Sequence, residues 1–176
     1  MSDIYGSIEQ SQNIIKKILG KLPGFNGYVE RSNRRASDKI LRETIAEGYE
    51  EQLQAISRLE RDLISFGSIE YLDDLDAARL KVLRFAAKIK TASYGYSPFF
   101  DAVQVNEDEL AKVYQYDLAL LESTDALKRA VENVGSSIGT DGLPAAIRNL
   151  VSVAEDSNAA LELRDNVLRG TADQGG

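Results

Sequence analysis

Apolar residues between Leu110 and Val134 recur at alternating intervals of three and four, and this spacing constrains the fold more than any other feature. The stripe consists of Leu110, Val113, Asp117, Leu120, Thr124, Leu127, Val131 and Val134. A 3–4 spacing is the heptad pattern of helices that pack against other helices along their length. The segment is therefore predicted to be one long helix, with Asn106 as its N-cap and one face buried against neighbouring helices.

Three more segments carry helical stripes and are separated by short turns. One runs from about Ser32 to Phe66, with its stripe starting at Leu41 and a weak point at Gly48. It stops at Gly67-Ser68, and another helix runs from about Glu70 into the nineties. The last stripe consists of Leu143, Ile147, Leu150, Ala154, Ser157, Leu161 and Leu168.

Long helices joined by short turns favour an antiparallel bundle. The predicted fold is all-α, an antiparallel bundle of four long helices with a short amphipathic N-terminal helix. The predicted divisions are a basic N-terminal helix and turn (1–30), the bundle (31–170) and a disordered tail (171–176).

The N-terminal segment is an amphipathic helix with a basic side. Its apolar arc consists of Ile14, Ile15, Ile18, Leu19 and Leu22, and its cations are Lys16, Lys17 and Lys21. Pro23-Gly24 ends the helix. Such a helix docks on its own bundle, lies on an anionic membrane surface or is captured by a partner protein. These eight residues are the predicted partner- or membrane-binding set, and docking on the bundle is the favoured alternative for the same pattern.

Charge is distributed unevenly along the chain. Residues 14–42 hold eight Lys or Arg and two Asp or Glu, a net charge of +6 in a chain whose total is −7. The remainder is therefore strongly acidic, which argues against nucleic-acid binding. The chain has no cysteine or histidine, which excludes disulfides, thiol nucleophiles, imidazole metal sites and histidine-dependent catalysis.

An aromatic block lies between two predicted helices, where a solvated loop would be polar. It contains Tyr94, Tyr96, Phe99 and Phe100, followed by Asp101. Each aromatic ring can bury roughly 150–250 Å². The favoured interpretation is an apolar plug that caps the bundle core, with Asp101 capping or bracing it. The alternative is an aromatic-lined groove for a ligand or a partner.

Asp117 places a carboxylate on a stripe whose other members, apart from Thr124, are apolar. A buried carboxylate has to be paired, hydrogen-bonded or protonated. The candidate partners are the hydroxyls of Tyr94 or Tyr96, or an arginine from the helix expected at about 32–66 or from the helix that follows it. A register-fixing polar pair is the favoured interpretation. The alternatives are a ligand or proton site, or surface exposure of Asp117 through imperfect periodicity.

Three cations cluster where the first long helix begins: Arg34, Arg35 and Lys39. Cations at a helix N-terminus oppose the helix dipole unless an anion compensates them. They are candidates for an anion site, and a solvated basic face is the favoured alternative.

Four blocks of the sequence resemble an uncharacterised bacterial family of all-helical proteins. They are PGFNGY (23–28), RRASDK (34–39), YGYSPFFDAV (94–103) and YQYDLALL (114–121). The resemblance covers about residues 20–135. It implies a bacterial, cytoplasmic origin and a helical fold, and it brings no activity and no site residues.

The functional prediction is a non-enzymatic interaction or adaptor protein. Its basic N-terminal segment would dock on a partner protein or an anionic membrane surface, and a homo-oligomer is also expected. The alternative is a small-ligand binding module around residues 94–103 and Asp117. No metal or cofactor is expected. Without a visible signal peptide or a membrane-length apolar run, the predicted location is cytoplasmic, with peripheral contact at the inner membrane surface.

Overall fold

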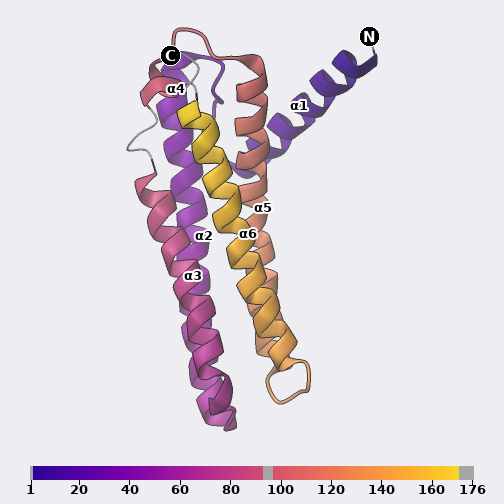
Figure 1. The fold of residues 1–176 in the computed structure, drawn as a ribbon, viewed down its shortest axis with the longest axis vertical. Helices are drawn as coiled ribbons and strands as arrows, with labels where there is room; N and C mark the ends of the chain where they lie inside the picture. The colour runs from indigo at the N-terminus through magenta and orange to yellow at the C-terminus, as the bar shows by residue number, and fades with distance from the viewer. Residues whose placement is uncertain (1, 93–96, 171–176) are drawn as a thin grey trace.

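The computed structural model describes residues 2–92 and 97–170, and every regular element in these ranges is a helix (Figure 1). This confirms the all-α prediction. The elements are α1 (Ser2–Lys21), α2 (Arg31–Phe66), the short 3₁₀ helix η1 (Ile69–Tyr71), α3 (Leu72–Thr91), α4 (Ser97–Asp101), α5 (Glu107–Ser137) and α6 (Leu143–Gly170).

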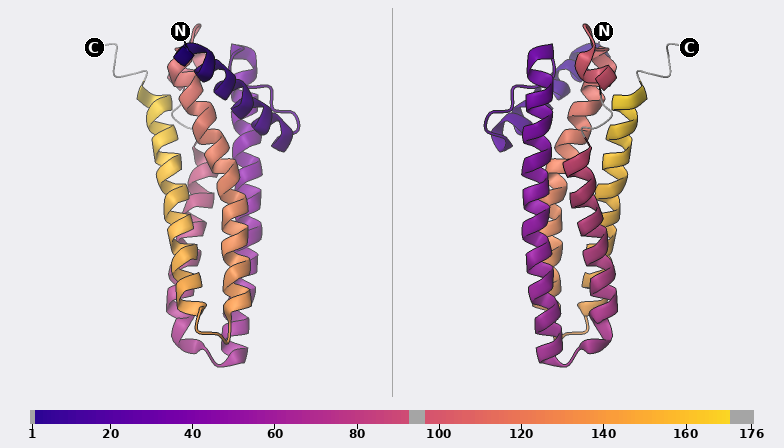
Figure 2. Two further views of the ribbon diagram at one scale, coloured as in Figure 1. Left: turned by 90° about the vertical axis from the view of Figure 1, so that its right-hand side faces the viewer. Right: turned by 90° about the vertical axis from the view of Figure 1, so that its left-hand side faces the viewer.

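Four helices, α2, α3, α5 and α6, lie side by side in all three views (Figures 1 and 2). We call them the body. The turn between α2 and α3 and the turn between α5 and α6 both lie at one end, the lower end. The start of α2, the short α4, the start of α5 and the end of α6 lie at the opposite, upper end (Figure 1).

Local sequence signals set where the helices begin and end. α2 stops at Gly67, which has a left-handed φ of 87° and donates its backbone N–H to Ile64 O at 3.1 Å. Ser68 N donates to Leu63 O at 2.9 Å, so the last carbonyls of the helix are satisfied. At the start of α5, the Asn106 side chain accepts a hydrogen bond from Asp108 N at 2.8 Å. The predicted stop at Gly67-Ser68 and the predicted N-cap at Asn106 are both confirmed.

Gly48 lies where α2 and α5 approach each other closely. A Cβ at this position would overlap the Cγ2 methyl group of Thr124. The missing side chain therefore allows the two helices to pack closely, which offsets the low helix propensity of glycine.

α1 has two different halves. Ile18 and Leu22, at its end and just beyond it, are fully buried in the core, and Lys21 Nζ pairs with Asp125 of α5 at 3.0 Å. The first half of the helix projects away from the body (Figure 1). The buried residues of the turn that follows, Phe25 and Tyr28, also belong to the core, so this end of the N-terminal segment packs with the body.

The aromatic block contributes to the core as predicted, in the form of a short helix. Phe99 and Phe100 of α4 are both buried. Tyr94 and Tyr96 lie outside the described residues. Among the helices of residues 2–92 and 97–170, none is both long and apolar enough to cross a lipid bilayer.

Candidate functional site

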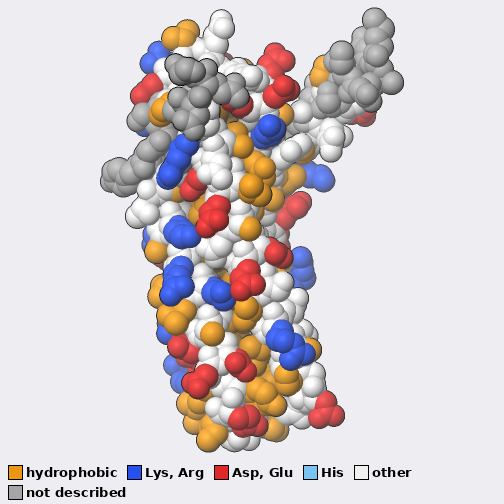
Figure 3. All heavy atoms as spheres, viewed as in Figure 1, with side chains coloured by type: hydrophobic (Ala, Val, Ile, Leu, Met, Phe, Trp, Pro, Cys, Tyr) orange, Lys and Arg blue, Asp and Glu red, His pale blue; other side chains and the backbone are white. Residues whose placement is uncertain are grey.

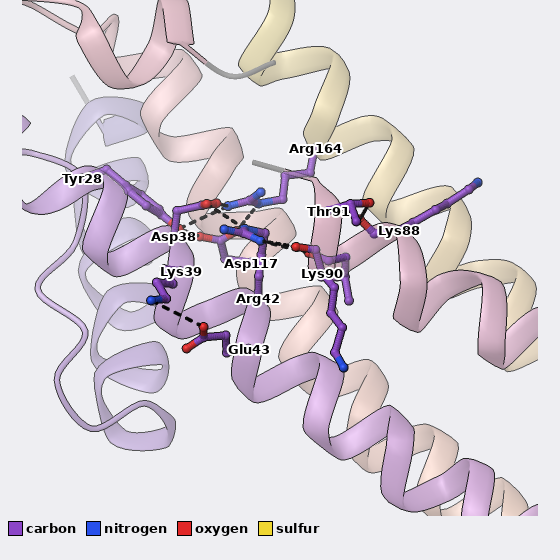
Figure 4. Close-up of polar contacts among 11 residues, drawn as sticks. Tyr28, Asp38, Lys39, Arg42, Glu43, Lys88, Lys90, Thr91, Asp117 and Arg164 are labelled. Atoms are coloured by element: carbon purple, nitrogen blue, oxygen red, sulfur yellow. Dashed lines mark hydrogen bonds and ion pairs between the residues drawn. The ribbon is translucent and has the colours of Figure 1, made fainter. Parts of the chain in front are cut away.

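Five polar side chains from four parts of the chain meet inside the upper half of the body (Figure 4). Tyr28 comes from the turn after α1, Asp38 and Arg42 from α2, Asp117 from α5 and Arg164 from α6. We call these five residues the ionic cluster. Arg164 and Asp117 have no exposed surface, and the other three are buried as well. Buried charges are found where they are paired, and this cluster shows how the pairing is achieved.

Asp117 receives one hydrogen bond on each carboxylate oxygen. Arg164 Nε donates to Oδ1 at 2.5 Å, and the Tyr28 hydroxyl donates to Oδ2 at 2.5 Å. Both contacts are short, as expected for hydrogen bonds to an ionised acceptor. The polar position on the α5 stripe is therefore occupied by a paired carboxylate.

The other carboxylate of the cluster, Asp38, bridges two arginines. Arg164 Nη2 donates to its Oδ1 at 2.8 Å, and Arg42 Nε donates to its Oδ2 at 2.7 Å. Arg42 also reaches α3, where its Nη1 donates to Lys90 O at 2.9 Å and to Ile89 O at 3.3 Å. The cluster thus ties together all four helices of the body and the turn after α1.

Arg164 is at the centre of this arrangement. Its Nη2 also donates to the Tyr28 hydroxyl at 3.3 Å, and its Nη1 is buried without a hydrogen-bond partner. Removing this one side chain would leave both Asp38 and Asp117 with an unpaired oxygen inside the body.

Burial and neighbouring charges shift the acid–base properties of the cluster. Burial, reinforced by the Asp117 carboxylate, raises the pKa of Tyr28 well above its ordinary value, so the phenol stays protonated. Burial lowers the pKa of Arg164, but Asp117, Tyr28 and Asp38 more than reverse this and hold the pKa well above its usual value. Burial also raises the pKa of Asp117, and Arg164 and the Tyr28 hydroxyl act in the opposite direction.

An aromatic shell surrounds Tyr28. Its ring lies 5.4 Å from Phe25, 5.9 Å from Phe99 and 5.3 Å from Tyr114, measured between ring centroids. Its backbone N–H donates to the Tyr114 hydroxyl at 2.8 Å. The tyrosine that pairs with Asp117 is Tyr28, whereas Tyr94 and Tyr96 had been the candidates, and the arginine is Arg164 of α6 and not an arginine of α2 or α3 as predicted.

Arg34 is part of the buried framework and is not free to bind an external anion. Its Nε donates to Tyr28 O at 2.8 Å, and its Nη1 donates to Ala102 O at 2.7 Å and Phe99 O at 3.2 Å. The residue is 2% exposed. The prediction of an anion site or a solvated basic face is therefore wrong for Arg34, because backbone carbonyls of the turn after α1, of α4 and of the residue after α4 use its donors.

The other two predicted cations are exposed and have protein partners. Arg35 Nη2 lies 2.8 Å from Asp101 Oδ1, and its guanidinium carbon lies 5.4 Å from the centre of the Phe100 ring. Lys39 Nζ lies 3.8 Å from Glu43 Oε1. Asp101 thus holds an arginine over the aromatic block, which is the geometry of a brace.

The predicted partner-binding residues of α1 fall into two groups. Ile18 and Leu22 face the core, so the prediction that they contact a partner is wrong for them, because the body already covers them. Leu19 is 47% exposed, Lys16 and Lys17 are exposed, and Ile14 and Ile15 are half-buried. Lys21 is exposed and paired with Asp125.

The ionic cluster has the character of a structural network. The side chains of the cluster make their hydrogen bonds with one another and with backbone carbonyls, and its residues are buried. Across residues 2–92 and 97–170, no group of three or more acidic side chains is arranged to hold a metal ion. Surface grooves lie elsewhere, for example one of about 380 Å³ between α2 and α5 that is lined by Gln52, Arg58 and Lys128.

Comparisons of the chain with protein-family models, with curated proteins and with solved structures gave no match. The functional argument therefore starts from the geometry alone.

Proposed function

We propose that the chain is an antiparallel four-helix bundle that acts as a non-enzymatic interaction protein and docks on a partner protein through the free face of α1. The observation that carries this proposal is the projection of the first half of α1 from the body (Figure 1). A helix that leaves the body gains little stability from its own fold, since isolated short helices are marginal in water. A binding partner would provide the missing contacts.

The free face of α1 has the composition of a docking surface. Ile8, Ile15 and Leu19 fall within about 40° of one another at about 100° per residue. Ile8 is 50% exposed and Leu19 is 47% exposed, whereas Ile15 is half-buried. Ile15 packs partly against the core, so Ile8 and Leu19 are the exposed residues of this stripe. We call these two residues the free stripe.

An anionic membrane surface is the second candidate for this face. Lys16 and Lys17 are exposed; Lys16 lies about 60–80° from Ile8 and Leu19 at about 100° per residue, and Lys17 lies on the opposite side of the helix. A lysine close to an anionic surface contributes on the order of 1 kcal/mol. We favour a protein partner, because two lysines and two exposed apolar side chains give marginal membrane affinity.

A ligand-binding module is less well supported. Its proposed pocket was to be lined by the aromatic block and Asp117, yet Phe99 and Phe100 are buried and Asp117 has both oxygens engaged. A ligand would have to displace core contacts to reach them.

Site-specific photo-crosslinking tests the proposal. A photoreactive amino acid at position 8 or 19 of the intact protein should give adducts with another polypeptide in the source cell. The same amino acid at the exposed Lys128 of α5 is the matched control and should give none. Co-sedimentation with phosphatidylserine vesicles tests the membrane candidate in parallel. Adducts at neither α1 position, together with no binding to vesicles, would show that the free stripe has no docking role.

Truncation separates the two halves of α1. Removing residues 1–13 takes away the projecting part and should leave the melting temperature unchanged. Removing residues 1–24 also takes away Ile18 and Leu22, which are fully buried. Each of them contributes about 1.5–3 kcal/mol of burial, so the longer truncation should be clearly destabilised. Equal melting temperatures for the two truncations would show that α1 is not anchored as described.

A further inference from the structure

The body consists of two helical hairpins that meet along two seams. One hairpin is α2 with α3, and the other is α5 with α6. α2 lies beside α5 along one seam, and α3 lies beside α6 along the other. Both hairpin turns lie at the lower end, and the chain passes from one hairpin to the other between Thr91 and Glu107, at the upper end (Figure 1). The chain itself therefore connects the hairpins at the upper end alone.

Polar contacts between the two hairpins extend from the upper end to the middle of the body. At the upper end, Arg164 Nη2 of α6 donates to Asp38 Oδ1 of α2 at 2.8 Å within the ionic cluster. In the middle, the Tyr49 hydroxyl of α2 donates to Ser157 Oγ of α6 at 2.6 Å and lies 2.9 Å from Ser123 Oγ of α5. These contacts hold the two hairpins together in the upper half of the body.

The lower half of the two hairpins is joined in a different way. Its uppermost contact is the ion pair between Lys81 Nζ of α3 and Glu155 Oε1 of α6, 3.0 Å apart. Across residues 51–80 and 124–154, all of which the structure describes, no hydrogen bond or ion pair joins one hairpin to the other. The contacts there are apolar, for example where a Cβ built on Gly135 would lie 3.2 Å from Leu59 Cδ2.

Surface grooves follow both seams in this lower half. One groove of about 410 Å³ lies between α2 and α5, and its lining includes Leu59 and Gly135. Another of about 330 Å³ lies between α3 and α6, and its lining includes Ala77, Pro144 and Ile147. Figure 3 shows hydrophobic side chains at the surface in the lower half of the face that α3 and α6 share. Parting the hairpins here therefore exposes less new apolar surface than parting a seam without grooves.

One aromatic side chain connects the two hairpin turns at the lower end. Phe66, in the last turn of α2, is 62% exposed, and its ring lies against the turn between α5 and α6. A Cβ built on Gly139 would lie 2.5 Å from Phe66 Cζ and 3.0 Å from Phe66 Cε1. The missing side chain of Gly139 thus makes room for the ring. We call this contact between Phe66 and Gly139 the latch.

We propose that the body opens at its lower end, where the two hairpins part, and that the latch controls this opening. Parting the upper end would separate Arg164 from Asp38 and leave buried charges unpaired, which is strongly unfavourable. Parting the lower end breaks the latch and apolar contacts only, and local opening occurs in the part of a fold with the weakest contacts. The opening uncovers the buried Leu63, Leu75 and Leu143. It does not depend on the docking role of α1.

Distances between pairs of spin labels, measured by electron paramagnetic resonance, test the inference. The sequence contains no cysteine, so each pair of introduced cysteines carries the only labels. Arg61→Cys with Ser152→Cys labels α2 and α6 in the lower half, and Thr44→Cys with Asn166→Cys labels the same helices in the upper half. All four positions are exposed, so labelling should leave the melting temperature unchanged. The lower pair should give a second, longer distance beside the main one, and the upper pair should give a single distance.

A substitution of Phe66 then tests the latch. In the protein labelled at the lower pair, Phe66→Ala should raise the fraction of molecules at the longer distance at least about threefold, because the ring no longer buries apolar surface against Gly139. Ile64→Ala is the matched control, since Ile64 is 57% exposed on the same turn of α2, and it should leave this fraction unchanged. A single distance for the lower pair in Phe66→Ala overturns the inference, and so does an equal fraction in the two variants.

Discussion

The two ends of the body are stabilised by different kinds of contact. At the upper end, Asp117 and Arg164 form a fully buried ion pair within a network that reaches all four helices of the body. At the lower end the buried side chains are apolar, as at Leu63, Leu75 and Leu143. Apolar packing tolerates many alternative arrangements of similar volume, whereas a buried carboxylate accepts few positions for its partner. We infer that the buried ion pair at the upper end fixes the relative positions of the helices. The apolar packing at the lower end adds stability but is compatible with several arrangements.

Loss of Arg164 should produce the largest single effect. In Arg164→Ala, one carboxylate oxygen of Asp38 and one of Asp117 would lose the hydrogen bond from Arg164 and remain buried. Breaking a buried pair by removing one side chain costs about 3–5 kcal/mol. Urea denaturation should show this loss relative to Arg148→Ala, an exposed arginine on the same helix that serves as the control. Equal stabilities for the two variants would mean that the upper end depends on packing alone.

Truncation of a core leucine at the lower end should cost somewhat less. Leu75 of α3 is fully buried, and Leu→Ala at such a site costs about 3 kcal/mol, within the usual range of 2–5. Leu75→Met keeps the volume and should cost less than about 1.5 kcal/mol. A large loss of unfolding free energy in Leu75→Met, measured in the same denaturation experiment, would show that the lower end tolerates changes in side-chain shape as poorly as the upper end.

The long helices and one member of the ionic cluster could be predicted from the sequence, because the apolar stripes have a helical spacing. Asp117 was found because it interrupts the apolar stripe of α5. Arg164 occupies the missing step between Leu161 and Leu168 on the stripe of α6, so the same test would have found it. Extending the α2 stripe backwards from Leu41 would have reached Asp38 and Arg34.

Other features of the site could not be predicted from the stripes. Tyr28 lies in a turn, where periodicity gives no indication of which way a side chain points. Its pairing with Asp117 joins residues 89 positions apart, and this depends on how the turn after α1 packs against α5. For the same reason, the pattern of α1 could not show that Ile18 faces the core while Leu19 faces solvent.

Replacing Tyr28 by Phe removes the hydroxyl that donates to Asp117 and keeps the aromatic ring in place. The variant leaves Asp117 Oδ2 without its hydrogen bond, and a hydrogen bond to a charged group contributes about 1.5–3 kcal/mol. We expect a loss of about 2 kcal/mol at neutral pH. A stability equal to that of the unmodified protein would indicate that the Asp117 carboxylate needs no second donor.

The same variant should also change the response to alkaline pH. The folded state holds the Tyr28 proton because burial raises the pKa of its phenol, whereas the unfolded chain releases that proton near pH 10. Above about pH 10 the unfolded state therefore binds fewer protons, and stability falls by about 1.4 kcal/mol per pH unit for this group. Tyr28→Phe should fall less steeply, and a residual slope should remain because burial also raises the pKa values of Tyr49 and Tyr114. Parallel pH profiles would contradict this assignment.

The smallest change in unfolding free energy is expected for substitution of an exposed side chain at the lower end. Ile64 lies one residue after Leu63, which is fully buried, yet it is 57% exposed. Ile64→Ser should therefore change the free energy of unfolding by no more than about 0.5 kcal/mol, as usual for surface substitutions. Leu63→Ser is the matched comparison and should cost several kcal/mol, because it leaves a cavity and a buried hydroxyl. A clear loss of stability in Ile64→Ser, measured at a concentration where the protein is monomeric, would show that this side chain is part of the core.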